Sequence, residues 1–287
     1  MSEFRHKQKL QLFCAMNKIV QFVSFTLIFL FSCTNSGTTE NAGNTNNNAT
    51  EIPQVLKNLA EEIKKYPDST SLRLQLATAY DSIGHFKEAV SQMDSLTLKD
   101  SLNYGLWFAK GEIAEDAADT SLAVASFIKA IKVYPSPDAM LALAELYAEQ
   151  KNAESILICG RVKNMELGRE KDADCAFITG IYFARTGDKN AALKSFDECV
   201  GYNYTYMEAY IEKGLVYFDN KQYDDALKVF SFATTVNNLY ADAYYYQARC
   251  YEMMNKKDSA ILKFQQSLGL DKNLQEAHEG LNRLGAE

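Results

Sequence analysis

Alanine recurs in this 287-residue chain at a spacing that indicates a repeated structural unit. The gaps between successive positions are 34, 69, 34 and 34 residues, and a gap of 69 accommodates two units with one inserted residue. The positions are Ala89, Ala123, Ala192, Ala226 and Ala260. A period of this length is typical of stacked supersecondary units, each too small to bury its own apolar face.

Two further positions keep the register of these alanines. A large apolar residue follows four residues later, and a small residue precedes by twelve. The large residues are Met93, Phe127, Phe196, Phe230 and Phe264, and the small ones are Ala77, Gly111, Gly180, Gly214 and Ala248. The pattern resembles the tetratricopeptide repeat (TPR), a helix–turn–helix unit with helices A and B. The resemblance implies an all-α fold, a right-handed superhelical solenoid of antiparallel helix pairs.

About six repeats and terminal helices fit within residues 53–287. The ranges are about 70–103, 104–136, 137–172, 173–206, 207–240 and 241–274, with a cap helix at 275–284. The third repeat is degenerate, because Ile156 and Gly160 replace the expected alanine and large apolar residue. Gly84 and Gly187 are expected between helices A and B, where a residue with positive φ ends helix A. Residues 54–66 predict one amphipathic helix before the first repeat.

The N-terminal region contains an uncharged apolar run of 14 residues, from Ile19 to Ser32. A membrane-spanning helix needs about 20 apolar residues, so the run better fits the apolar region of a secretory signal peptide. The sequence Leu30-Phe31-Ser32-Cys33 resembles a bacterial lipobox, which implies cleavage before Cys33 and its lipidation. We therefore assign residues 1–32 to an N-terminal extension and a lipoprotein signal peptide. An uncleaved anchor and plain secretion are the alternatives.

Residues 33–52 are then the lipidated cysteine and a flexible linker. This segment has almost no large apolar side chain and cannot offset the entropy lost on ordering. Both Met1 and Met16 are possible translation starts, since Met16 lies just before the apolar run. The assignment predicts a lipid-anchored protein of the cell envelope, at the outer membrane.

The composition argues against several function classes. A formal net charge of −7 disfavours nucleic acid as a partner, because a nucleic-acid binder needs a basic face. With 3 histidines and no catalytic or metal-ligand motif, we expect no metal, no cofactor and no enzymatic activity. Four cysteines remain after the signal peptide and lipid site: Cys159, Cys175, Cys199 and Cys250. They are either small buried thiols or, in an exported protein, disulfide partners, with Cys159–Cys175 the first pair to test.

The TPR resemblance implies a concave groove lined by helix A side chains. The predicted groove residues are Phe108, Glu112, Glu115, Asp116, Glu145, Glu149, Arg185, Glu208, Phe218, Asp219, Tyr245, Arg249 and Glu252. Tyr245 is the foremost contact candidate, whereas Tyr244, at the position of Trp107, is expected in the core. Carboxylates and aromatic rings suit a basic or aromatic-bearing protein or peptide. Alternatively, the acidic residues serve only to keep the solenoid soluble.

These features together predict a membrane-anchored adaptor. It would bind a partner segment in the groove and organise an assembly in the cell envelope, held at the membrane through Cys33. Two other functions stay open at this stage. The chain could be an accessory or substrate-presenting subunit of an envelope enzyme, or a glycan-binding lipoprotein.

Overall fold

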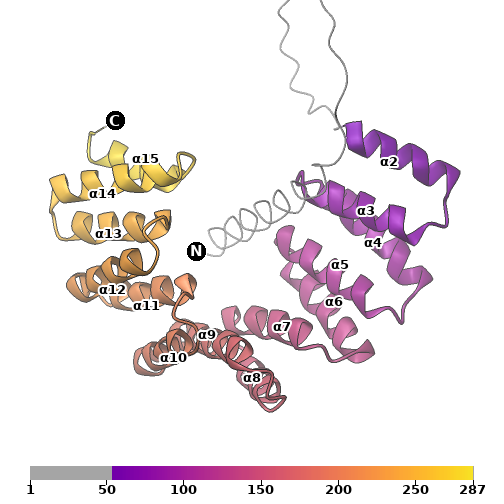
Figure 1. Ribbon diagram of the computed structural model, residues 1–287, viewed down its shortest axis with the longest axis horizontal. Helices are drawn as coiled ribbons and strands as arrows, with labels where there is room; N and C mark the ends of the chain where they lie inside the picture. The colour runs from indigo at the N-terminus through magenta and orange to yellow at the C-terminus, as the bar shows by residue number, and fades with distance from the viewer. Residues whose placement is uncertain (1–53, 287) are drawn as a thin grey trace, which may run out of the picture. The chain divides into compact units, whose positions relative to one another are not determined.

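The computed structural model describes residues 54–286, and every regular element in that range is an α-helix (Figure 1). These residues form 14 helices, α2 to α15, in the paired antiparallel arrangement typical of a TPR solenoid. The all-α prediction is therefore confirmed. The assigned signal peptide, Cys33 and the linker lie outside the described residues. The chain divides into two compact units, one ending at Tyr134 and the other beginning at Pro135.

The first unit contains α2 and the helices of two repeats. α2 packs on α3, and the A/B pairs are α3 with α4 and α5 with α6. The amphipathic helix predicted at 54–66 is α2, and its buried residue is Leu56. The helices of the first unit are α2 (Gln54–Lys65), α3 (Thr70–Asp81), α4 (Phe86–Lys99), α5 (Tyr104–Asp116) and α6 (Thr120–Val133).

The second unit contains four further A/B pairs and a terminal helix. The pairs are α7 with α8, α9 with α10, α11 with α12 and α13 with α14, and α15 packs on α14. The helices are α7 (Pro137–Glu149), α8 (Glu154–Lys163), α9 (Arg169–Thr186), α10 (Lys189–Tyr202), α11 (Met207–Asp219), α12 (Tyr223–Val236), α13 (Ala241–Met253), α14 (Lys257–Leu270) and α15 (Gln275–Arg283).

The third repeat departs from the regular pattern where its sequence does. Helix B has 14 residues in the other five repeats but 10 in α8. α9 compensates by beginning at Arg169, before the range assigned to the fourth repeat, and it runs for 18 residues. Gly168, with φ of 98°, precedes it in a conformation that favours glycine. The irregularity is therefore confined to the segment from α8 to the start of α9.

The small residue of helix A and the aromatic residue of helix B form one contact in several repeats. Gly111, Gly180 and Gly214 lie against the rings of Phe127, Phe196 and Phe230, where a Cβ atom would overlap the ring. In the sixth repeat helix A has Ala248, and the ring of Phe264 lies against Gly280 of α15. The four rings are fully buried. Close approach of helices at glycine thus explains why the spacing is preserved.

The A-to-B turn has a residue with positive φ in every repeat. Gly84 and Gly187 take this position as predicted. The other four repeats place Ala118, Lys151, Lys221 and Asn255 there, with φ between 56° and 60°. The backbone geometry is thus conserved among repeats where the sequence does not provide glycine, at a cost in strain.

A polar contact fixes the loop before helix A in several repeats. The indole of Trp107 donates to the carbonyl of Ser101 at 2.9 Å, and the hydroxyls of Tyr210 and Tyr244 donate to Tyr204 and Asn238 at 3.1 and 3.2 Å. Each carbonyl lies six residues before its donor. Arg73 and His278 make the corresponding contact at the two ends of the array. This helix A position therefore holds the preceding loop in place.

Candidate partner-binding surface

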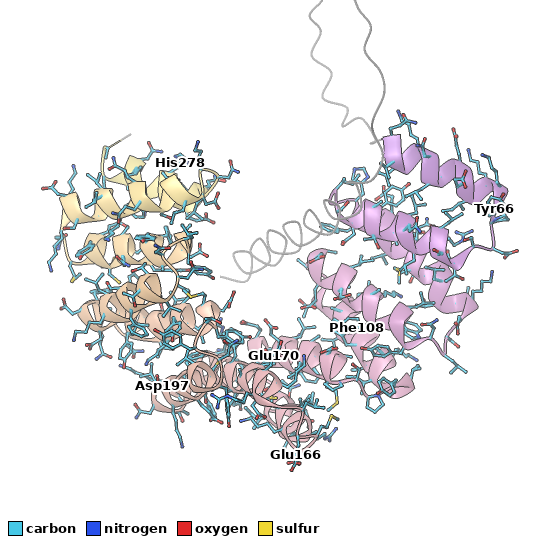
Figure 2. All side chains as sticks on the ribbon, viewed as in Figure 1. Tyr66, Phe108, Glu166, Glu170, Asp197 and His278 are labelled. Carbon is cyan, nitrogen blue, oxygen red and sulfur yellow. The ribbon has the colours of Figure 1, made fainter. Side chains whose placement is uncertain are left out.

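The predicted groove residues lie on helix A of their repeats, and Figure 2 labels one of them, Phe108 on α5. Four belong to the first unit and nine to the second, so each unit has its own set. Most are half-buried, whereas Asp219 is exposed and Tyr245 is buried. Most of these side chains therefore bury part of their surface against neighbouring helices and expose the rest.

In the first unit, carboxylates of α3 and α5 form a cluster. Burial, the charge and hydrogen bond of Asp116, and the charge of Glu112 raise the pKa of Asp81 to about 7. One carboxylate oxygen of Asp81 is buried without a hydrogen-bond partner among the described residues. Such a cluster favours protons or a basic group nearby. Glu112 and Asp116 were predicted site residues, and Asp81 joins them.

Phe108 lies beside this cluster on α5. Its ring stacks on Tyr104, with centroids 5.8 Å apart, and lies 5.7 Å from the ring of Phe127. Phe127 is fully buried, whereas Phe108 is half-buried. One edge of the aromatic core of the second repeat therefore reaches the helix A surface.

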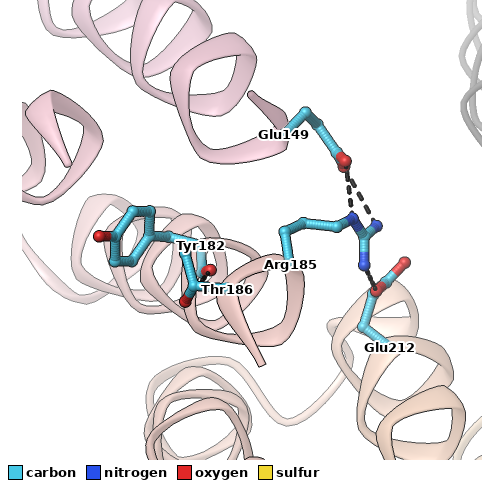
Figure 3. A network of polar contacts seen from close by, with 5 residues as sticks. All are labelled: Glu149, Tyr182, Arg185, Thr186 and Glu212. Carbon is cyan, nitrogen blue, oxygen red and sulfur yellow. Dashed lines mark hydrogen bonds and ion pairs between the residues drawn. The ribbon is translucent and has the colours of Figure 1, made fainter. Parts of the chain in front are cut away.

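In the second unit, Arg185 connects three successive helix A elements (Figure 3). Its guanidinium donates two hydrogen bonds to Glu149 of α7, at 2.7 and 3.2 Å, and one to Glu212 of α11 at 3.3 Å. Burial lowers the pKa of Arg185, but the hydrogen bonds and charges of the two glutamates outweigh this and raise it above its ordinary value. The arginine predicted to face a partner thus holds repeats together.

A second acidic cluster lies on α7, α9 and α11. Burial raises the pKa of Glu208, and the charge of Glu145 raises it further. Burial also raises the pKa of Asp174, against the charge of Lys171 and a hydrogen bond from Tyr206. The Tyr206 ring stacks on Phe177 at 5.0 Å, which brings aromatic surface beside the carboxylates.

The last predicted residues form a chain of contacts from α11 to α15. The Arg249 guanidinium lies 5.9 Å from the centre of the Phe218 ring, and its Nε is 3.2 Å from Glu252. Glu252 also accepts two hydrogen bonds from Arg283, at 3.0 and 3.2 Å. The Arg249 cation is therefore taken up within the protein, as that of Arg185 is.

The structure places the two tyrosines differently from the sequence expectation. Tyr245 has 6% of its surface exposed, packs on Tyr246 and Phe264, and its hydroxyl accepts a hydrogen bond from Arg249. Tyr244, expected in the core, is half-buried and bonds to the preceding loop. The comparison with Trp107 did identify the equivalent position, but its side chain lies over the loop.

Sequence reasoning missed Asp174, Tyr206 and Glu212. The period contained a signal for the first, because Asp174, Glu208 and Asp242 are each separated by 34 residues. The range assigned to the fourth repeat begins at residue 173, so Asp174 takes the same second position as Glu208 and Asp242 in their repeats. No spacing rule pointed to Glu212, which is buried and is recognised by its contact with Arg185.

The described residues contain neither a metal-binding cluster nor a membrane-spanning helix. Between residues 54 and 286, no group of three or more His, Cys, Asp or Glu side chains is arranged to hold a metal ion. In the same range, no helix is both long and apolar enough to span a membrane.

A family model described as tetratricopeptide repeat matches residues 110–155, 177–233 and 211–274, which together cover half of the chain. The chain belongs to the tetratricopeptide repeat family. TPR domains bind proteins or peptides, so this TPR protein is a protein–protein interaction scaffold. Scaffolds of this family are generally not enzymes.

Solved structures show the same fold at low sequence identity. A TPR protein from Parabacteroides merdae ATCC 43184 is 15% identical, with a TM-score of 0.68 over 82% of this chain and 93% of that one. PilW, described as a widely conserved type IV pilus biogenesis factor, is 18% identical, with a TM-score of 0.59 over 74% of this chain and 98% of its own. A comparison with curated protein sequences finds no significant match.

Proposed function

We propose that this TPR protein is a non-catalytic, membrane-anchored adaptor that binds a basic or aromatic-bearing segment of a partner protein along its helix A surface. The observation that carries the proposal is the presence of an acidic cluster beside aromatic rings in each unit. Asp81, Glu112 and Asp116 form one, and Glu145, Asp174 and Glu208 form the other. Carboxylates beside half-buried aromatic rings favour a cationic, partly apolar ligand.

The two arginines of the surface strengthen this preference. Arg185 and Arg249 are both engaged with glutamates of the same unit. They are therefore poorly placed to attract an acidic segment, because a new anion would have to compete with contacts already made. The surface should therefore prefer cationic ligands, although it includes two arginines.

The binding proposal is tested by neutralising carboxylates without changing their shape. The variant carries Glu112→Gln, Asp116→Asn, Glu145→Gln and Glu208→Gln. The matched control removes four exposed helix B carboxylates, each in the first turn of its helix: Glu88→Gln, Glu154→Gln, Asp224→Asn and Asp258→Asn. Both variants change the formal charge equally, so net charge alone cannot separate them.

The full chain is incubated with an array of synthetic peptides that varies basic, acidic and aromatic content. We expect basic-aromatic peptides to bind, with affinity reduced about tenfold in the helix A variant and little changed in the control. Equal binding by both variants, or a preference for acidic peptides, would contradict the proposal. Binding of oligosaccharides without peptide binding would favour the glycan-binding alternative.

We further propose that the anchor is a lipid on Cys33 and that the protein acts in the cell envelope, at the outer membrane. The lipobox resemblance supports this, and PilW, which shares the fold, is named for pilus biogenesis. A lipid anchor concentrates a scaffold at one surface, so modest affinity becomes effective. Mass spectrometry and membrane fractionation of a Cys33→Ala variant test the point. We expect the loss of lipid mass and release from the membrane, whereas an unchanged mass and location would refute it.

A further inference from the structure

Two of the four cysteines in the described chain lie against each other across α8 and α9. Cys159 and Cys175 are buried free thiols, and Sγ of Cys175 lies 3.5 Å from the carbonyl oxygen of Cys159. The two thiols also interact directly: a shared hydrogen bond raises the pKa of Cys159 and lowers that of Cys175. Cys199 and Cys250 are buried free thiols as well, on α10 and α13, so the chain supplies its own controls.

The helix that carries Cys159 is the shortest helix B among the described residues. α8 has 10 residues where the others have 14. The hydroxyl of Ser155, in its first turn, is buried without a hydrogen-bond partner among residues 54–286. A short helix with an unsatisfied buried hydroxyl is expected to open before the rest of a fold. Opening of α8 exposes both thiols together.

The turn that joins the two helices gives a second reason for local opening. Glu166, labelled in Figure 2, has φ of 53° in this turn, and Gly168 follows with φ of 98°. A non-glycine residue in the left-handed region stores strain that is released when the segment unfolds. The strain lies between the two cysteines in sequence, within the loop that a bond between them would close.

We propose that Cys159 and Cys175 form a disulfide that links helix B of the third repeat to helix A of the fourth. A disulfide-bearing oxidant supplies the reaction by thiol–disulfide exchange. The Cys175 thiolate attacks one sulfur of the oxidant and displaces the other as a thiol, which gives a mixed disulfide. The Cys159 thiolate then attacks the Cys175 sulfur and displaces the second thiol. The protein loses two electrons and two protons, and the oxidant is reduced to two thiols.

A disulfide between Cys159 and Cys175, which are 16 residues apart in sequence, would close a loop that joins the shortest helix B to α9. Closing such a loop removes conformations from the unfolded ensemble, which stabilises the folded state. The cysteine pair would be a modification site whose oxidation stabilises the irregular third repeat. The proposal does not depend on the location of the protein in the cell, because the oxidant can be supplied in vitro.

The experiment uses the full chain, unfolded and refolded in detergent with oxidised glutathione, then alkylated and digested with trypsin. Each of the four cysteines of residues 54–286 falls on its own tryptic peptide; Cys159 is in 152–161 and Cys175 in 172–185. We expect these two peptides to be joined and two hydrogens lighter than their sum, with Cys199 and Cys250 alkylated. The oxidised protein should melt on the order of 5–10 °C above the reduced protein.

Variants Cys159→Ala and Cys175→Ala should each lose the joined peptide and the difference in melting temperature. A Cys199→Ala variant should keep both. The proposal is overturned if Cys159 and Cys175 are alkylated in refolded helical protein, or if they join any other cysteine of the chain instead. Treating the folded protein with oxidised glutathione also gives the rate at which the disulfide forms. A joined peptide that forms faster when mild denaturant loosens the fold supports oxidation through opening of α8, and failure to form it under any folded condition opposes that route.

Discussion

The ring of Phe196 occupies the space that a side chain at Gly180 would need. A Cβ atom built on Gly180 would lie 2.5 Å from Cε1 of the ring, well inside van der Waals contact. The two residues belong to α9 and α10, and Phe196 is fully buried. Their contact sets how closely the two helices of the fourth repeat approach.

We predict that Gly180→Ala destabilises the second unit by about 1–3 kcal/mol, because the added methyl group overpacks the contact with Phe196. Gly160→Ala is the matched control, since a Cβ there meets nothing within 4 Å and φ is not positive. That change should instead stabilise by about 0.5–1 kcal/mol through helix propensity. Urea denaturation followed by circular dichroism measures both. A neutral Gly180→Ala would show that the helices separate without cost.

A second prediction concerns the A-to-B turn of the fifth repeat. Lys221 has φ of 60°, a conformation that costs a residue with a Cβ about 1–2 kcal/mol. Lys221→Gly removes this strain but adds unfolded-state entropy, so we expect a net gain of about 0.5–1 kcal/mol. Gly187→Ala, at the equivalent turn of the fourth repeat, should lose a similar amount. Thermal melts of the two variants should therefore shift in opposite directions, and shifts of the same sign would oppose this explanation.

The contacts of Arg185 predict coupling between three repeats. The side chain of Glu212 is only 8% exposed. Arg185→Met removes the guanidinium that contacts this buried carboxylate, and should lower the free energy of unfolding by about 1–3 kcal/mol. Arg185→Lys should recover only part of this, because an ammonium cannot form the two-point contact with Glu149. A double-mutant cycle with Glu149→Gln measures the pair directly. Strict additivity would mean that the contact contributes nothing.

The raised pKa of Asp81 predicts a specific dependence of stability on pH. The pKa of Asp81 in the folded state is about 7, above its ordinary value of 3.8, so between these pH values the folded state keeps the proton and the unfolded state does not. The free energy of unfolding therefore falls as pH rises from about 4 to 7. Asp81→Asn should be more stable than the parent at pH 8 and about equal at pH 4. Equal effects at both pH values would remove Asp81 as the cause.

Much of the fold could be predicted from the sequence because a repeat imposes its spacing on each unit. Gly111, Gly180 and Gly214 were identified twelve residues before an alanine, and the structure explains them by contact with a ring. The start of α9 could not be predicted in the same way. It depends on the shortened α8, and a period describes only what all repeats share.

The candidate site was predictable in its position but not in its contacts. The period places residues such as Arg185 on helix A, yet its partners are 36 and 27 residues away, neither of which is a multiple of the repeat. Tyr245 shows the same limit, because burial depends on which way a side chain turns between neighbouring helices. A helical face can be read from spacing, whereas pairing across repeats requires the stacked structure.

The contact between Trp107 and the carbonyl of Ser101 gives the first unit its own optical reporter. The chain has 1 tryptophan, so its fluorescence senses the second repeat and the loop before it. All four cysteines of residues 54–286 belong to the second unit. Because they are buried, the rate of their alkylation reports how often the second unit opens. Tryptophan emission and alkylation of these four cysteines, recorded on the protein without substitutions, thus follow the two units separately, without an introduced dye.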